Sequence, residues 1–400
     1  MTDRERFKAI CRGEQPAGGA PLDYVPILGF PGSPGMANGC MSHTRERLVE
    51  QGMPEWVGAE YVPYQSGPLR SWQRYWGTTS PVYPDFGLAL PGTGIACQVQ
   101  QENGWETYEW ETGARTRQVV DNDNIYIMPD FQAFHVRDRK SWEFYRERAA
   151  AAGRRPSADI EADIAAFDRG DRSQAAHRSL AIGVGSTWGG LRGLMGPERA
   201  CTVLYDDPGP AHEIIDAGLQ DFETYVAPLI ERLRPEILSA SEDNCYNHGM
   251  LISPRHFMEF CAPFYRRVAE VARDCGVDMV AIDTDGNAMG LVPLVEACGV
   301  NAIHPFEVKA GNDLLRLRAR HRNFILMGWL EKEVVNEGNG NLIEGEIMSK
   351  VPRLLAHGRY FPNGDHGIQP LVTFDNLCRF MTLLHEVTGN PEGEFPRMGA

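Results

Sequence analysis

Polar and ionisable side chains follow five consecutive apolar runs in the second half of the sequence. These groups are Ser241-Glu-Asp-Asn244, Asp283-Thr-Asp-Gly-Asn287, His304-Pro-Phe-Glu307, Gly328-Trp329 with Glu331-Lys332, and Asn363-Gly-Asp-His-Gly367. Asp283 and Asp285 are two residues apart, so in an extended chain both side chains point to the same face. Two adjacent carboxylates hinder each other's ionisation, which suits one of them to donate a proton near neutral pH. Together with His366 they are also suited to bind a divalent cation.

The chemistry of these residues gives three classes of candidate. The candidate catalytic residues are Asp283, Asp285 and His366, which are also the candidate metal ligands; the candidate substrate-binding residues are Glu242, Asn244, His304, Glu307, Trp329 and Arg192. Trp329 would form a stacking wall for a planar ligand. Structural interpretations stay open at this point: an Asp-x-Asp-Gly segment is typical of a helix-capping turn, Glu242 could pair with Arg192 or Arg255, and His304 could belong to the edge of the core.

The apolar runs alternate with helical patterns throughout this half. Strands are predicted at 180–185, 236–240, 278–282, 300–303, 323–327 and 358–361, and helices at 197–204, 212–233, 254–275, 288–298, 313–321, 342–357 and 374–387. Such repetition with short connections forces parallel strands, whose carboxyl ends share one edge. An open doubly wound sheet stays open as an alternative, but its Gly-rich dinucleotide fingerprint is missing. Length and steady alternation favour a single α/β domain of the (β/α)8 TIM-barrel class, with its chemistry at that edge.

The first half is less regular. Residues 3–12 predict a helix in an N-terminal extension, and residues 63–120 form an aromatic-rich insert of loop and hairpin within a single domain of residues 1–400. Alternation over 98–120 around Asn103-Gly104 predicts a β-hairpin. The segment that starts at Gly183-x-Gly185 follows a strand and is a weak candidate for an anion cradle, because it lacks the lysine of a phosphate loop.

Composition excludes several classes of protein. The chain has 400 residues, with 39 Lys and Arg against 54 Asp and Glu, so its formal net charge is 39 − 54 = −15. That charge and the absence of a long basic run argue against nucleic-acid binding. We expect no membrane span, because no run of about 18 apolar residues occurs, and no signal peptide, because the N-terminus is charged. Nine scattered cysteines without a C-x-x-C pair predict reduced thiols in a cytoplasmic protein.

Several segments of the chain resemble the uroporphyrinogen decarboxylase superfamily. The resemblance lies in Arg4–Gly13, Leu191–Gly196, Glu242–Pro254, Asp283–Asn287, Gly299–Glu307 and Asp365–Gly367. It implies a (β/α)8 barrel with the site at the carboxyl ends of the strands. True decarboxylases of the superfamily carry an Arg-Gln-Ala-Gly-Arg-Tyr segment that holds the substrate's carboxylates, whereas the corresponding stretch here, residues 29–36, has no arginine. An octa-anionic substrate is unfavourable for so acidic a chain without that clamp.

The other branch of the superfamily comprises methyltransferases of corrinoid-dependent systems. Its thiol-methylating members hold zinc with a His-x-Cys pair and a later Cys, and the matching positions here are Asp283, Asp285 and His366. An oxygen-rich set is a harder site than a thiolate one and weakens the case for zinc, so the expected ion is zinc or another divalent metal such as magnesium, and a site without metal stays open. The resemblance implies transfer of a methyl group from a small methyl ether to cob(I)alamin (the corrinoid), with Asp285 or His366 protonating the leaving oxygen and Glu242 and Asn244 positioning the substrate.

The partners expected on this basis are a small methyl donor, a corrinoid protein and a second copy of the chain in a homodimer. Two alternatives stay open: a decarboxylase of the uroporphyrinogen type, and a barrel that binds a ligand without catalysis.

Overall fold

A computed structural model describes residues 1–14, 22–29, 42–60, 70–84, 95–120, 129–151, 161–162, 164–165, 167, 177–336, 339–368 and 371–398. Its centre is a parallel sheet of six strands in the order β12-β11-β10-β9-β6-β5. The strands are β5 (Ala181–Gly183), β6 (Ile237–Ser241), β9 (Met279–Thr284), β10 (Ala302–Pro305), β11 (Ile325–Leu330) and β12 (Tyr360–Gly364). Every strand predicted in the second half is present, and the predicted parallel α/β arrangement is confirmed.

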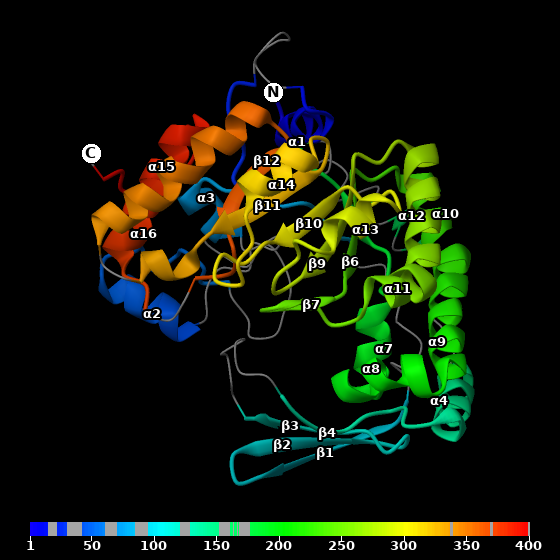
Figure 1. The fold of residues 1–400 in the computed structure, drawn as a ribbon. Coiled ribbons are helices and arrows are strands. Elements are labelled where there is room, and N and C mark those ends of the chain that lie inside the picture. Colours follow the sequence, from blue (N-terminus) through cyan, green and yellow to red (C-terminus); the bar gives the residue numbers. More distant parts are fainter. Residues whose placement is uncertain are drawn as a thin grey trace.

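Helices follow the strands and cover the outer face of the sheet (Figure 1). They are α7 (Trp188–Met195), α8 (Pro197–Asp206), α9 (Pro208–Asp221), α10 (Ala227–Leu233), α11 (Pro254–His256), α12 (Ala262–Cys275), α13 (Val292–Glu296), α14 (Leu314–Arg320), α15 (Gly340–His357) and α16 (Phe374–Thr388). The continuous helices predicted at 212–233 and 254–275 are each interrupted by a π-helical turn, at Phe222–Val226 and Phe257–Cys261. Pro228 and Pro263 follow these turns, and a proline without an N–H disrupts regular α-helical bonding there.

Two further segments extend the sheet by single parallel bridges. Val82 pairs with Leu180 and Leu28 with Thr79, and the Thr79 N–H donates to the carbonyl of Ile27 at 3.0 Å. At the other edge, the side-chain amide of Asn363 donates to the carbonyl of Leu28. Regular parallel pairing among the described residues covers six strands, so a closed barrel of eight stays a prediction.

The inner face of the sheet is apolar at one end and polar at the other. Residues at alternate positions of the strands, among them Ile237, Ala281 and Phe361, form an apolar cluster with Phe7 of α1 (Asp3–Arg12). The rings of Phe7 and Phe361 stack at 5.1 Å. Arg4 of the same helix pairs with Glu236, just before β6, at 2.6 Å. Helix α1 therefore closes the amino end of the strands, and the carboxyl end is left for chemistry.

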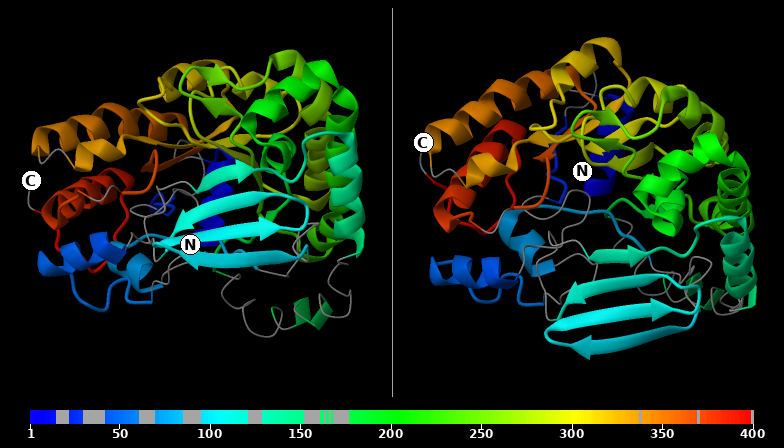
Figure 2. Two further views of the ribbon diagram at one scale, coloured as in Figure 1. Left: turned by 90° about the horizontal axis from the view of Figure 1, so that it is seen from below. Right: turned by 60° about the horizontal axis from the view of Figure 1, so that its bottom comes forward.

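The predicted hairpin is part of a larger antiparallel sheet. It has the order β1-β2-β3-β4, with β1 (Cys97–Glu102), β2 (Trp105–Trp110), β3 (Arg115–Val119) and β4 (Asp130–Ala133). Asn103 and Gly104 form the first turn with φ of 52° and 78°, as the Asn-Gly signal predicts. Figures 1 and 2 show this sheet beside the carboxyl ends of the parallel strands, at the opposite end of the molecule from α1.

Other helices among the described residues are α2 (Ser42–Glu50), α3 (Arg70–Trp76), which the sequence did not predict, and α4 (Arg139–Ala151). Within the part of the chain that the structure describes, no helix is both long and apolar enough to cross a bilayer.

Candidate functional site

The predicted aspartate pair lies at the carboxyl end of β9. Asp283 is within the strand and Asp285 follows its end, before a turn in which Gly286 has φ of 76°. The helical turn that follows is capped by Asn312, whose side-chain oxygen accepts a hydrogen bond from the N–H of Ala288 at 2.9 Å. The two aspartates are therefore not used as helix caps, and their carboxylates are left for other interactions.

Each aspartate faces a different histidine. His304 of β10 lies in register with Asp283, and its Nδ1 is 3.6 Å from Asp283 Oδ1. His366, just after β12, places Nε2 at 3.9 Å from Asp285 Oδ1. The Gly367 N–H donates to Nδ1 of His366 at 3.0 Å, so the neutral ring carries its hydrogen on Nε2, towards Asp285. The structure thus brings the candidate residues together as two carboxylate–imidazole pairs.

Asp285 is the residue best suited to proton transfer. Burial, followed by the negative charges of Asp243, Glu307 and Asp283, raises its pKa to about 7 against the opposing effect of Lys332. Its side chain is nevertheless 53% exposed, so a ligand at the carboxyl end of the strands can reach it. The pKa of His366 is lowered, chiefly by burial and then by Lys332. Near neutral pH this pair therefore contains a carboxyl group that is partly protonated beside a neutral imidazole.

Lys332 links the loops that surround this pair. Its ammonium lies 3.7 Å from Glu307 Oε1, 3.6 Å from Glu333 Oε1 and 3.9 Å from Asp365 Oδ1, and its side chain is 12% exposed. Glu307 in turn accepts the Gly286 N–H at 2.8 Å. The network connects the loops after β9, β10, β11 and β12, and so fixes the positions of the residues beside Asp285.

Asp365 forms the base of this network. It is 1% exposed and accepts the backbone N–H groups of Val308 at 2.8 Å and Lys332 at 3.0 Å. Burial raises its pKa to about 6, although Lys332 and both N–H groups favour the ionised form. The candidate list contained neither Lys332 nor Asp365. Both lie in the polar groups that follow predicted strands, but their role depends on contacts between separate loops.

The candidate metal ligands do not form a metal site. Among the described residues, no group of three or more His, Cys, Asp or Glu side chains is arranged to hold an ion. Asp283 faces His304, whereas Asp285 faces His366, so the three expected ligands diverge into separate pairs. Zinc and other divalent ions require ligands that converge on one point. The expected metal therefore does not fit these residues, and no chemistry is assigned to it here.

Both carboxylate oxygens of Glu242 accept hydrogen bonds from other groups of the protein. It is fully buried, and burial raises its pKa. Its Oε1 accepts the N–H of Thr187 at 2.6 Å and the hydroxyl groups of Thr187 and Tyr265, while Oε2 accepts the Gly189 N–H at 2.6 Å. The Gly-rich segment that could have held an external anion thus leads into α7 and binds the carboxylate of Glu242. This side chain positions α7 against β6.

The other candidate substrate-binding residues have mixed environments. Arg192 of α7 pairs with Asp243 at 2.6 Å, and both are about one-third exposed at the carboxyl end of β6. Asn244 is completely buried, and both polar atoms of its side chain lack a hydrogen-bond partner. Trp329 is 7% exposed, donates its indole N–H to the carbonyl of Asn312 at 2.7 Å and lies against Lys350. Its ring therefore packs in the core, and the exposed wall expected of it is not seen.

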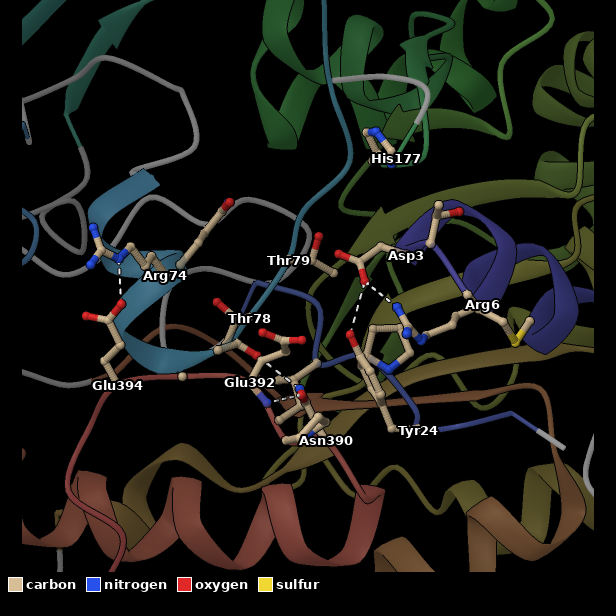
Figure 3. Close-up of a pocket in the computed structure, with 18 residues that line it drawn as sticks. Asp3, Arg6, Tyr24, Arg74, Thr78, Thr79, His177, Asn390, Glu392 and Glu394 are labelled. Atoms are coloured by element: carbon tan, nitrogen blue, oxygen red, sulfur yellow. Dashed lines mark hydrogen bonds and ion pairs between the residues drawn. The ribbon is translucent and has the colours of Figure 1, made fainter. Parts of the chain in front are cut away.

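A separate cavity of about 650 Å³ lies at the other end of the molecule, between the start of α1 and residues 390–394. Figure 3 shows several of its polar side chains paired with one another. Asp3 accepts from Arg6 at 3.0 Å and from the hydroxyl of Tyr24 at 3.4 Å, and Arg74 pairs with Glu394 at 2.6 Å. Because it adjoins α1 at the amino ends of the strands, this cavity is remote from the aspartate pairs.

The fold and the polar strand ends define a parallel α/β protein with its candidate site at the carboxyl edge of the sheet. The sequence profile described as "Uroporphyrinogen decarboxylase (URO-D)" matches residues 175–387, which is more than half of the chain. The chain belongs to the uroporphyrinogen decarboxylase family, as its motifs predict. Among solved structures, a methyltransferase from Methanosarcina mazei is similar with a TM-score of 0.59 and 15% identity, over 96% of this chain and 99% of that one. At this identity the likeness concerns the fold. A search of curated proteins finds no match.

Proposed function

We propose that this protein is a methyltransferase of a corrinoid-dependent system, which removes a methyl group from a small methyl ether. The observation that carries the proposal is the Asp285–His366 pair at the carboxyl end of the sheet. A carboxyl group whose pKa is about 7 can donate a proton near neutral pH. Support also comes from the fold, which is shared over nearly the whole chain with a methyltransferase.

In the proposed reaction the carbon–oxygen bond of the methyl ether breaks and its electron pair stays on oxygen. Protonated Asp285 donates its proton to that oxygen, so that an alcohol or phenol leaves. The resulting carboxylate lies 3.9 Å from Nε2 of His366, so the ring N–H would stabilise the negative charge through its dipole. A reduced corrinoid on a partner protein would supply the nucleophile that accepts the methyl group. Because Asp285 is 53% exposed, solvent can return its proton.

The residues beside this pair position it. Glu307 accepts the N–H of Gly286, the residue after Asp285. Asn244 follows β6 and is buried, and Arg192 is held by Asp243 at the end of the same strand. We assign Glu242 an indirect role, since its oxygens already accept protein donors. We further propose that the two bridged segments at Leu28 and Val82 complete a closed barrel of eight strands around this site.

A decarboxylase of the uroporphyrinogen type is the alternative within the family. A substrate with many carboxylates is disfavoured, because the two cations that the described residues place beside the site, Arg192 and Lys332, are already paired with carboxylates of the protein. A carboxylate-rich ligand would have to compete with Asp243, Glu307 and Asp365 for these cations.

The test is a direct assay of both reactions. The purified protein is mixed with chemically reduced cob(I)alamin and a panel of methyl ethers, and methylation is followed from the absorbance of the corrinoid while the released alcohol is identified by mass spectrometry. A parallel assay measures carbon dioxide from uroporphyrinogen. We expect methyl transfer from at least one ether and no carbon dioxide. Absence of transfer from every ether, or release of carbon dioxide, contradicts the proposal.

A further inference from the structure

Asp243 lies beside the proposed proton donor, just after the carboxyl end of β6. Its N–H donates to the carbonyl of Asp283 at 3.2 Å, and the N–H of Glu242 donates to the same carbonyl at 3.0 Å. Its side chain binds the same segment a second time, because Oδ1 accepts the N–H of Asp285 at 3.4 Å. Asp243 therefore contacts the chain on both sides of Thr284 and connects the end of β6 to the segment that carries the acid.

The backbone of Asp243 is held in an uncommon conformation. Its φ is 47°, in the left-handed region that residues other than glycine rarely adopt. Besides the bond to Asp283, the indole N–H of Trp188 donates to the carbonyl of Asp243 at 3.2 Å. Such a conformation persists where neighbouring contacts enforce it, and it is found most often at functional sites. The contacts with Asp283 and Trp188 therefore fix the carboxylate of Asp243 beside Asp285.

The other oxygen of this carboxylate binds the guanidinium of Arg192. Nη2 of Arg192, on α7, lies 2.6 Å from Asp243 Oδ2. One carboxylate thus contacts a cation through Oδ2 and the backbone of the proton donor through Oδ1. The two side chains are 33% and 36% exposed, so this ion pair is only partly screened by solvent. A change in the charge of either residue therefore changes the electrostatic potential at Asp285.

The charged groups that the described residues place around the Asp285 carboxyl come from several strand ends. They are Asp243 after β6, Asp283 in β9, Glu307 after β10, Lys332 after β11 and His366 after β12. After burial, Asp243 raises the pKa of Asp285 most among these groups. Asp243 is thus the neighbour that combines a bond to the Asp285 backbone, a large electrostatic effect and a cation of its own.

We propose that the Arg192–Asp243 ion pair is a positioning element that sets how firmly Asp285 holds its proton. Asp243 fixes the Asp285 segment through its N–H and directs a negative charge at the carboxyl group, while Arg192 offsets part of that charge. Both act through Asp285, so they are positioning residues. The inference rests on the proposed function for the use of the proton, but the coupling between the ion pair and Asp285 is measurable without substrate.

A purely structural ion pair predicts a different result. Asp243→Asn and Arg192→Gln break the same salt bridge, so a structural role gives both variants an effect in the same direction. The proposed role gives opposite effects. Without the negative charge of Asp243, ionisation of Asp285 becomes easier and its pKa falls. Without Arg192, the charge of Asp243 is no longer offset and the pKa of Asp285 rises.

The test is an infrared titration of the full-length protein across neutral pH, without corrinoid or methyl donor. The band of the protonated Asp285 carboxyl group is identified by its loss in Asp285→Asn. We expect the pKa of Asp285 to fall by about 1 unit in Asp243→Asn and to rise by about 1 unit in Arg192→Gln. Arg192→Lys keeps the charge and should keep the pKa close to that of the wild type. Shifts in the same direction, or an unchanged pKa in Asp243→Asn or in Arg192→Gln, overturn the proposal.

Controls separate the charge effect from misfolding. Asparagine adopts the left-handed conformation more readily than most residues, so Asp243→Asn suits the backbone at that position, and thermal melting checks each variant. Glu213→Gln breaks a comparable ion pair, with Arg139 at 2.8 Å between α4 and α9, and should leave the pKa of Asp285 unchanged. An equal shift in this control overturns the proposal. If Asp243→Asn does not fold, equal pKa values in Arg192→Gln and Arg192→Lys overturn it.

The outcomes separate this inference from the proposed function. Opposite shifts in a protein that transfers no methyl group from any ether support the role of the ion pair and refute the methyltransferase. Methyl transfer whose pH profile is the same in the wild type, Asp243→Asn and Arg192→Gln supports the methyltransferase and refutes the role of the ion pair.

Discussion

Replacing Lys332 with methionine removes the only cation that the described part of the network provides for Asp365. The ammonium is 3.9 Å from Asp365 Oδ1, and two unit charges at that distance interact by about 4 kcal/mol at an effective dielectric constant of about 20. Since one pKa unit corresponds to about 1.4 kcal/mol, this is an upper limit of about 3 pKa units. Relaxation and water entry reduce it, so we expect the variant to raise the pKa of Asp365 by about 2 units.

The consequence is a loss of stability that depends on pH. The pKa of Asp365 is about 6 in the folded protein and about 3.9 when unfolded, so the folded state binds more protons and its stability falls as pH rises through the folded value. Raising the pKa of Asp365 in the folded protein extends this loss of stability to higher pH. Between about pH 6 and pH 8, the free energy of unfolding of Lys332→Met should therefore decrease relative to the wild type by about 2–3 kcal/mol. Urea denaturation at several pH values from about 5.5 to 8.5 measures this difference.

Lys309 provides a matched control. It lies 3.6 Å from Glu331 and from Glu333, but its side chain is 62% exposed, so Lys309→Met should cost at most about 1 kcal/mol with little dependence on pH. Lys332→Arg keeps the charge and should retain most of the stability. The reasoning is refuted if the deficit of Lys332→Met is the same at all pH values, or if Lys309→Met reproduces it.

Three further predictions concern the residues whose expected roles the structure changes. Glu242→Gln places an amide N–H₂ against protein donors and should lower the free energy of unfolding by about 2–4 kcal/mol in urea denaturation; a loss below about 0.5 kcal/mol would argue against the buried acceptor. Trp329→Phe loses the indole hydrogen bond and should destabilise by about 1 kcal/mol in urea denaturation without changing the rate of methyl transfer; a lower rate with unchanged stability would place the indole at the substrate. Metal analysis by mass spectrometry should find the same divalent-metal content in the wild type and in an Asp283→Ala/His366→Ala variant; one equivalent lost in the variant would restore the metal site.

Much of the fold could be predicted because its determinants are local. Helix α1 begins and ends at the predicted residues, Asp3 and Arg12, since Thr2 forms a capping box and Gly13 adopts a left-handed conformation. Ser253 and Gly276 likewise bound the predicted helical stretch at 254–275. The π-helical turns and α7 were not predicted. The stability of α7 depends on Glu242, which is more than 50 residues away in sequence, and a local pattern contains no such information.

The position of the site could be predicted from the sequence, but the role of each residue in it could not. Parallel strands bring their carboxyl ends to one edge, so Asp283, Asp285 and His366 were correctly expected at the same edge. Which carboxylate faces which imidazole depends on register and loop conformation, and the structure places Asp283 with His304. The sequence also does not show which side chains are buried. An indole is suited to stack on a ligand, but Trp329, whose backbone φ is 68°, packs its ring in the core.

The pH dependence of methyl transfer tests the central claim, that Asp285 protonates the leaving oxygen. Because the protonated carboxyl is the active form, the rate should fall as pH rises through about 7, the pKa that burial and neighbouring carboxylates give this group. Asp285→Asn should lower the rate by about 10²–10⁴-fold and remove that decline. An Asp285→Asn variant that keeps the wild-type rate and the same pH profile would contradict the account.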